Sequence, residues 1–92
     1  MGYRLLMAKR AKGELAELPE KFKHQVDQEI LKLPENPRPQ GVKKLHLPES
    51  GLGICWRIRS GKFRIIYKID DAAQTVTVTG IGDRKDVYRR FR

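Results

Sequence analysis

Residues 54–69 decide the fold, and they read Ile-Cys-Trp-Arg-Ile-Arg-Ser-Gly-Lys-Phe-Arg-Ile-Ile-Tyr-Lys-Ile. Apolar side chains alternate with polar or charged ones on both sides of Ser60-Gly61. A period of two, carried by β-branched and aromatic residues, predicts two half-buried strands. Ser-Gly is a turn dipeptide, so the two strands are expected to pair as a tight antiparallel hairpin.

The alternation also predicts how the two strands pair. A two-residue loop at Ser60-Gly61 sets Ile58 opposite Phe63 and Arg57 opposite Arg64, whereas a slip of one residue would turn a whole strand to the wrong face. This register places four cations and no acid on one face: Arg57, Arg59, Lys62 and Arg64. Like charges directly opposite each other destabilise a sheet.

Two interpretations of this basic face remain open. Charges on a strand commonly form a solvated face with no ligand. Alternatively, clustered cations on a rigid sheet suit a polyphosphate, because arginine presents a planar fork of donors to phosphate oxygens.

Length and charge restrict the functional classes. A chain of 92 residues makes one domain, residues 1–92, with a small core. The net charge is +9, and residues 53–92 carry ten Lys/Arg against four Asp/Glu. That excess should attract nucleic acid or an acidic protein. An anionic membrane surface is the weakest alternative, because no basic amphipathic helix is evident.

The expected location is the cytoplasm. A single cysteine, Cys55, cannot form an internal disulfide, which fits a reducing compartment. No apolar run approaches the ~18 residues that span a bilayer, and the apolar part of the first residues is too short for a secretory signal.

The remaining elements are predicted from periodicity and chain breakers. Residues 3–7 form a short apolar run that could be a first strand, and residues 8–18 and 19–33 each carry an apolar stripe at helical spacing. Prolines end the second helix after Leu33. Residues 43–47 could be a short edge strand and residues 75–79 a further strand, after which Gly80-Ile81-Gly82 disturbs the alternation. These elements predict an α+β fold with a two-helix hairpin packed on a sheet.

Sequence motifs for metal or thiol chemistry are weak. His24 and His46 lie 22 residues apart with one cysteine, so no zinc pattern exists and no metal or other cofactor is expected. Cys55 falls on the basic face by alternation but has no histidine partner placed by the sequence, so a structural thiol is expected. Trp56 is expected in the core.

The order of residues 56–67, followed by Gly82-Asp83-Arg84 and Asp86-Val87-Tyr88-Arg89, resembles the RelE/ParE superfamily of toxins from toxin–antitoxin pairs. The likeness covers nearly the whole chain. It implies a compact microbial ribonuclease fold, in which an N-terminal strand and two helices pack on a twisted, mainly antiparallel sheet. The cationic side chains would then converge on the exposed side of the sheet, opposite the helices.

The resemblance also implies a function. RelE-like members cleave messenger RNA in the ribosomal decoding site without a metal, and a cognate antitoxin silences them. ParE-like members of the same fold instead poison DNA gyrase without catalysis, and fold alone cannot separate the two. An RNA-binding module without toxicity is a third alternative.

Residue by residue, the family's functional groups fall on positions of this chain. The implied catalytic residues are Arg57, Arg64, Arg84 and Tyr88. The expected RNA-binding residues are Arg59, Lys62, Lys44, Lys68 and Arg89. Many relatives carry histidine where Asp83 stands here, which leaves the general base open among Asp83, His46 and Tyr88.

Overall fold

The computed structural model describes residues 2–47 and 53–83. In these ranges the chain forms two helices and five strands. Their bounds are β1 (Arg4–Met7), α1 (Lys9–Ala16), α2 (Glu20–Lys32), β2 (Lys43–Leu47), β3 (Gly53–Ser60), β4 (Phe63–Asp70) and β5 (Thr75–Asp83). Arg84, Tyr88 and Arg89, three of the predicted site residues, lie outside the described ranges.

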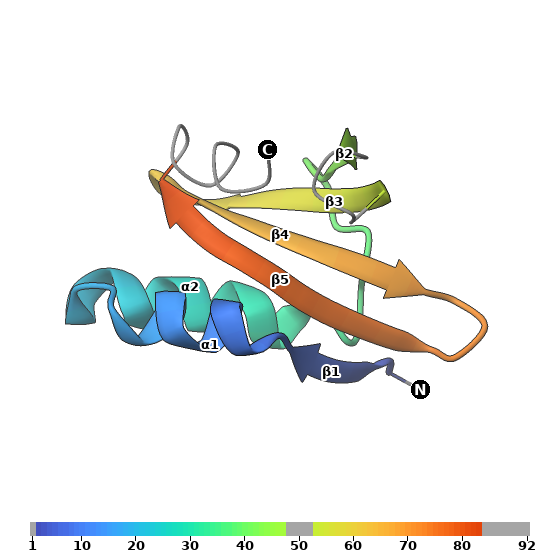
Figure 1. Cartoon of the computed structure of the whole chain (residues 1–92), viewed down its shortest axis with the longest axis horizontal. Helices are drawn as coiled ribbons and strands as arrows, with labels where there is room; N and C mark the ends of the chain where they lie inside the picture. The colour runs from blue at the N-terminus through green and yellow to red at the C-terminus, as the bar shows by residue number, and fades with distance from the viewer. Residues whose placement is uncertain (1, 48–52, 84–92) are drawn as a thin grey trace.

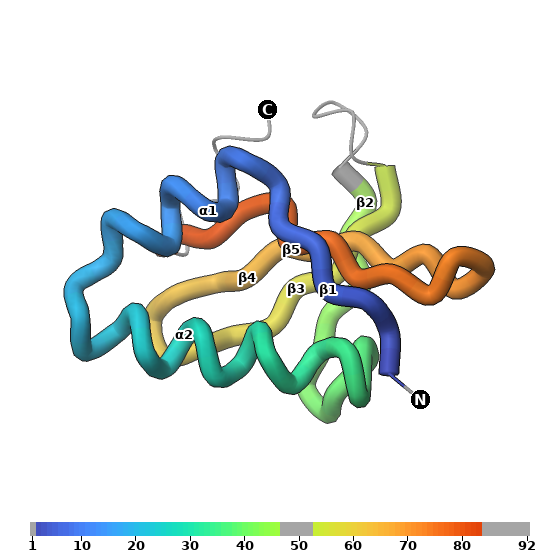
Figure 2. Tube along the Cα trace, turned by 90° about the horizontal axis from the view of Figure 1, so that it is seen from below, coloured from blue at the N-terminus to red at the C-terminus, as the bar shows by residue number. Residues whose placement is uncertain are grey.

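The five strands form one twisted sheet in the order β1-β5-β4-β3-β2. β1 runs parallel to β5, and the other neighbours are antiparallel. Both helices lie on one side of this sheet (Figures 1 and 2). The predicted α+β architecture, with a two-helix hairpin on a mainly antiparallel sheet, is confirmed.

The core forms between the helices and the sheet. Ala11 of α1 and Val26 and Ile30 of α2 are buried against apolar residues of β4 and β5, among them Ile65 and Val78. Pro19 immediately precedes α2, Glu20 stands in the first turn and Lys32 in the last, as the helix dipole favours. The apolar stripes seen in the sequence are therefore the faces that the helices bury.

α1 also protects the edge of β5. β1 pairs with β5 only over residues 75–78. Beyond that point the Ile81 N–H donates to Glu14 Oε1 at 2.9 Å. The carboxylate thus satisfies a backbone donor that the short first strand leaves without a strand partner.

The observed register of the central hairpin corrects the predicted one. Ser60 pairs with Phe63, Arg59 with Arg64, and Arg57 with Ile66. The turn is therefore Gly61-Lys62, one residue later than predicted. Gly61 has φ +59°, and type II′ hairpin turns need such a value at their first central residue, where glycine adopts it without steric cost.

The corrected register keeps the predicted faces of the strands. Each residue of β3 pairs with the β4 residue that lies two positions after the predicted partner. A shift of two positions preserves the alternation of side chains between the two faces. Ile58, Phe63 and Ile65 remain on the core side. Only the cross-strand neighbours change, together with the place of Lys62, which leaves the ladder and enters the turn.

The disturbance predicted around Gly80 is present. Tyr67 pairs with Val78 and Ile66 with Gly80, so Thr79 is the extra residue of an irregularity in β5. Its hydroxyl donates to the Ile66 carbonyl oxygen at 3.1 Å. β5 then continues to Asp83 and is longer than the predicted residues 75–79.

Candidate nucleic-acid interface

One face of the sheet gathers cations from three adjacent strands. We define the cationic face by Lys43 of β2, Arg57 and Arg59 of β3, and Arg64 and Lys68 of β4. Lys43 pairs with Arg57, and Arg59 with Arg64. Alternation from the buried Ile58, Phe63 and Ile65 puts these cations on the side of the sheet away from both helices.

The two central arginines are buried, which the sequence did not predict. Only 7% of Arg57 and 5% of Arg64 is exposed, whereas Lys43, Arg59 and Lys68 are exposed. The expectation that all these side chains lie on an open surface is therefore wrong for Arg57 and Arg64. The predicted side of the sheet is nevertheless correct, because neither arginine lies beneath the helices.

Arg57 has little polar support among the residues that the structure describes. No residue in the described part of the chain accepts a hydrogen bond from Arg57 Nε or forms an ion pair with Arg57. Arg64 Nη1 lies 3.5 Å from the carbonyl oxygens of Lys62 and Phe63, at the upper limit for a hydrogen bond. Guanidinium groups stay charged at any ordinary pH. A partly desolvated charge of this kind attracts an anion more strongly than a solvated one does.

The cross-strand partners of these arginines in the described strands carry no negative charge. Arg57 faces Ile66 on β4, and Ile66 faces Gly80 on β5. Arg64 faces Gly82. The described residues that lie in register with Arg57 or Arg59 across the sheet are therefore cations, an apolar residue and glycines. Because none of these residues is acidic, the electrostatic field that they produce favours a bound anion.

Lys62 does not belong to the cationic face, contrary to the prediction. Its ammonium lies 5.1 Å from the ring centroid of Phe22 on α2 and 5.4 Å from that of Phe63. Both rings belong to the core side of the sheet. The turn at Gly61-Lys62 is the reason, since it frees Lys62 from the alternation that would have aligned it with Arg64.

Lys44 also lies on the helix side. It pairs with Trp56, and its Nζ is 5.7 Å from the indole ring. Arg38 Cζ lies 4.9 Å from the same ring. The adjacent Lys43 shares the face of Arg57 instead. The sequence did not predict that Lys43 lies on this face. The pairing of a five-residue edge strand is set by its partner strand, and no pattern within the edge strand itself indicates it.

Cys55 lies on the cationic face by register, as its alternation predicted. The thiol is fully buried, and this desolvation raises its pKa, with Lys68 acting weakly in the opposite direction. A raised pKa lowers the thiolate fraction at neutral pH. This environment fits the predicted structural role.

Two candidates for the general base pair with residues of the opposite face. His46 pairs with Ile54, which alternates with Trp56 and Ile58, and Asp83 pairs with Phe63. Neither is in register with Arg57 or Arg64. Tyr88, the third candidate, lies outside the described ranges. In residues 2–47 and 53–83 the sheet thus places cations, and no carboxylate or imidazole, beside the buried arginines.

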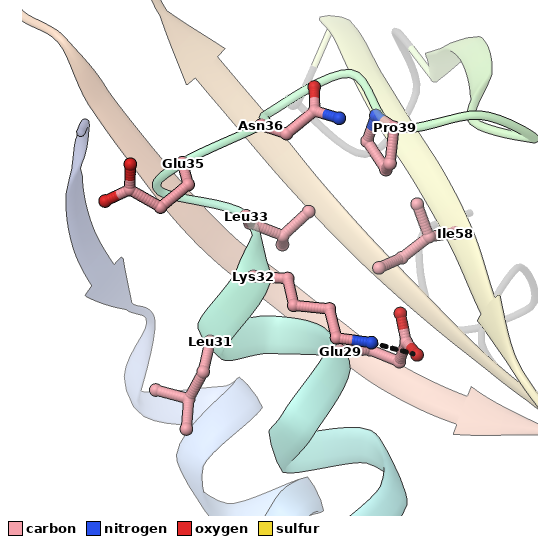
Figure 3. A pocket seen from close by; sticks show the side chains of 8 residues that line it. All are labelled: Glu29, Leu31, Lys32, Leu33, Glu35, Asn36, Pro39 and Ile58. Atoms are coloured by element: carbon pink, nitrogen blue, oxygen red, sulfur yellow. Dashed lines mark hydrogen bonds and ion pairs between the residues drawn. The ribbon is translucent and has the colours of Figure 1, made fainter. Parts of the chain in front are cut away.

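A hollow of about 430 Å³ lies on the helix side, where α2 ends (Figure 3). Leu33, Pro39 and Ile58 point toward one another across it, while Leu31 points away. None of the predicted site residues lines this hollow. It is therefore separate from the cationic face.

The described ranges contain neither a metal-binding cluster nor a membrane-spanning helix. The described ranges contain no cluster of three His, Cys, Asp or Glu side chains that could hold a metal ion. No helix within those ranges is both long and apolar enough to span a bilayer.

Comparisons of sequence and of structure with known proteins agree on one superfamily. The family model described as the ParE toxin of the type II toxin–antitoxin system parDE matches residues 5–88. A search of curated proteins finds no significant match.

Solved structures share the fold. The archaeal RelE–RelB complex from Pyrococcus horikoshii contains a chain with TM-score 0.76 and 25% identity, covering 91% of this chain and 97% of that one. The RelBE2 toxin–antitoxin complex from Mycobacterium tuberculosis gives 0.75 and 25%, covering 91% and 100%. The isolated RelE toxin of E. coli gives 0.71 and 25%, covering 88% and 83%. The chain therefore belongs to the ParE toxin family of type II toxin–antitoxin systems, within the RelE/ParE superfamily.

Proposed function

We propose that this toxin is a messenger RNA endoribonuclease that acts on the ribosome, inhibits translation and is neutralised by a cognate antitoxin in the cytoplasm. The observation that carries the proposal is the pair of buried arginines, Arg57 and Arg64, on the helix-free face beside the exposed Arg59. A phosphodiester backbone is the ligand that this arrangement would bind best.

The proposed reaction uses the nucleophile of the RNA itself. The 2′-hydroxyl attacks the adjacent phosphorus, its proton leaves to a base, and the bond to the 5′-oxygen of the next nucleotide breaks as that oxygen takes up a proton. Negative charge grows on the non-bridging oxygens on the way. Arg64 and Arg84 are assigned to those oxygens, and Arg57 and Arg59 to positioning the backbone.

Proton transfer has no assigned residue among those that the structure describes. Arginine cannot act as a base, and His46 and Asp83 pair with residues of the other face. We assign stacking on a base or assistance in proton transfer to Tyr88. Completion of the site by ribosomal RNA would make cleavage depend on the ribosome.

The antitoxin is proposed as the physiological partner. The RelBE2 structure from Mycobacterium tuberculosis is a toxin–antitoxin complex, and the Pyrococcus horikoshii structure is a RelE–RelB complex. A net charge of +9 on this chain favours an acidic segment in the partner.

A second function, inhibition of DNA gyrase without catalysis, is favoured by a separate observation. The family model that matches is the one described for the ParE toxin. The absence of a described base beside Arg57 and Arg64 also fits a binding role. Both functions would use the cationic face, one for chemistry and the other for contact.

The test is the mapping of messenger RNA ends in a translating extract with the purified toxin, followed by single substitutions. Under the nuclease proposal, wild type creates new ends, and Arg64→Ala and Arg84→Ala abolish them and the growth arrest. Lys12→Ala, on the exposed surface of α1, is the control and should act as wild type. Toxicity that survives Arg64→Ala and Arg84→Ala, together with loss of gyrase supercoiling, would reject the nuclease assignment.

A further inference from the structure

Two adjacent lysines of β2 point to opposite sides of the sheet. Lys43 pairs with Arg57, and Lys44 pairs with Trp56. Lys44 Nζ lies over the indole ring on the helix side, at 5.7 Å. Both lysines are exposed. The chain thus supplies two nearly identical charges, one residue apart, of which only one belongs to the cationic face.

Lys43 lies next to a buried charge. Residues directly opposite each other in an antiparallel pair have Cα atoms about 4.5–5.5 Å apart. Arg57 has no ion-pair partner in residues 2–47 and 53–83, and its Nε–H donates no hydrogen bond there. Like charges that face each other directly in a sheet repel each other. A phosphate bound between them would turn this repulsion into attraction.

The cations form a diagonal band across three strands. Lys43 on β2 faces Arg57 on β3, and two residues further along β3 Arg59 faces Arg64 on β4. With strands about 4.8 Å apart and about 6.7 Å between residues on the same face, the band is roughly 12 Å long from Lys43 to Arg64. β2 is the last strand of the sheet. The band therefore runs from the sheet edge to the hairpin turn.

On the basis of the proposed function, we propose that Lys43 is a further RNA-contacting residue, which holds a backbone phosphate outside the scissile position. The bound strand would cross the sheet edge over β2, pass Lys43, and reach the scissile phosphate at Arg57 and Arg64. Lys43 contributes to binding and not to the chemical step. Lys44, on the opposite side of the sheet, makes no contact with the RNA.

The experiment compares matched variants of the full chain. Binding of a short fluorescent single-stranded RNA is measured at several salt concentrations for wild type, Lys43→Ala and Lys44→Ala. Lys43→Ala should weaken binding about threefold to tenfold near 0.1 M salt and reduce the slope of log K against log salt by about 0.7, the value for one phosphate contact on a single strand. Lys44→Ala should keep the wild-type slope, and Lys43→Arg should restore it.

Cleavage in the translating extract gives the second readout. Lys43→Ala should raise the half-saturating concentration and leave the rate at saturation unchanged, as expected for a residue that binds ground state and transition state equally. Equal salt slopes for Lys43→Ala and Lys44→Ala, or a loss confined to the saturated rate, would overturn the proposal.

The Arg64→Ala variant distinguishes failure of the Lys43 proposal from failure of the proposed function. If Arg64→Ala abolishes cleavage while Lys43→Ala matches wild type, the nuclease assignment stands and the role of Lys43 is rejected. If the wild-type protein neither binds nor cleaves RNA, both are rejected. The Lys43 and Lys44 variants should show the wild-type circular dichroism spectrum, because both lysines are exposed.

Discussion

Arg59 and Arg64 lie directly opposite each other on β3 and β4. Like charges in this position destabilise a sheet by about 0.2–1 kcal/mol. Replacement of the exposed Arg59 by threonine, a good strand former, should therefore raise the free energy of unfolding by up to about 1 kcal/mol. Urea titration measures this change. The RNA affinity should fall in the same variant, and an unchanged affinity would exclude Arg59 from the interface.

Replacement of Arg57 should likewise raise stability while it impairs function, and both effects should be larger than at Arg59. Its charge is buried and has no ion-pair partner in the part of the chain that the structure describes. Substitution of buried charges by apolar residues of similar volume is commonly neutral or stabilising, by about 1–4 kcal/mol. Arg57→Met should thus unfold at a higher temperature than wild type, and under the nuclease proposal it should lose cleavage activity. A lower melting temperature would show that Arg57 contributes net stability.

Two glycines should respond to alanine in opposite directions. Gly13 lies inside α1, and a Cβ there would meet no atom within 4 Å. Gly13→Ala should stabilise the protein by about 0.5–1 kcal/mol. Gly61 has φ +59° in the hairpin turn, so Gly61→Ala should destabilise by about 1–2 kcal/mol. Denaturant midpoints of the two variants check the signs. A stabilising Gly61→Ala would contradict the turn geometry, and a destabilising Gly13→Ala would contradict the helix argument.

Tyr67 fixes the proline-rich connection to the sheet. Its hydroxyl donates to the Pro37 carbonyl oxygen at 2.6 Å, and burial raises the pKa of the phenol. Tyr67→Phe removes the donor and leaves that carbonyl without this hydrogen bond, at a cost of about 1–2 kcal/mol. Thermal unfolding checks this value. The RNA-binding constant is the control and should stay unchanged, because Tyr67 lies on the core side of the sheet.

Asp71 should make the stability of the folded protein depend on pH in the acid range. Arg38 donates to both carboxylate oxygens, at 3.2 and 2.9 Å, and Tyr3 donates to one at 2.6 Å. The hydrogen bond from Arg38, followed by that from Tyr3, lowers the pKa of Asp71 below its ordinary 3.8. A lowered pKa in the folded state gives stability that is complete above the ordinary value and is lost as pH falls through the folded value.

The test for Asp71 is the difference in melting temperature between wild type and Asp71→Asn. It should favour wild type at pH 7 and disappear below the lowered pKa. The effect should be small and sensitive to salt, because Asp71 is exposed. A difference that persists unchanged at the most acid pH would assign it to packing and not to charge.

Each element of the fold could be predicted from the sequence, because local periodicity reports the face that an element buries. Val26, Ile30 and Leu33 repeat at helical spacing, Phe63, Ile65 and Tyr67 repeat at strand spacing, and all six are buried. The faces of Arg57, Arg59 and Arg64 followed from the same alternation. They were correct even though the turn was predicted one residue too early, since the resulting shift of two positions preserves the side of the sheet.

Tertiary structure alone decided what surrounds those side chains. The partners of Lys43 and Lys44, the departure of Lys62 from the ladder, and the burial of Arg57 and Arg64 depend on contacts between segments far apart in the chain. The physical reason is that backbone geometry fixes alternation within each strand, whereas register and burial are set by the packing of one strand against another. The sequence therefore determined which side of the sheet the arginines occupy, and only the fold determined that two of them lose their contact with water.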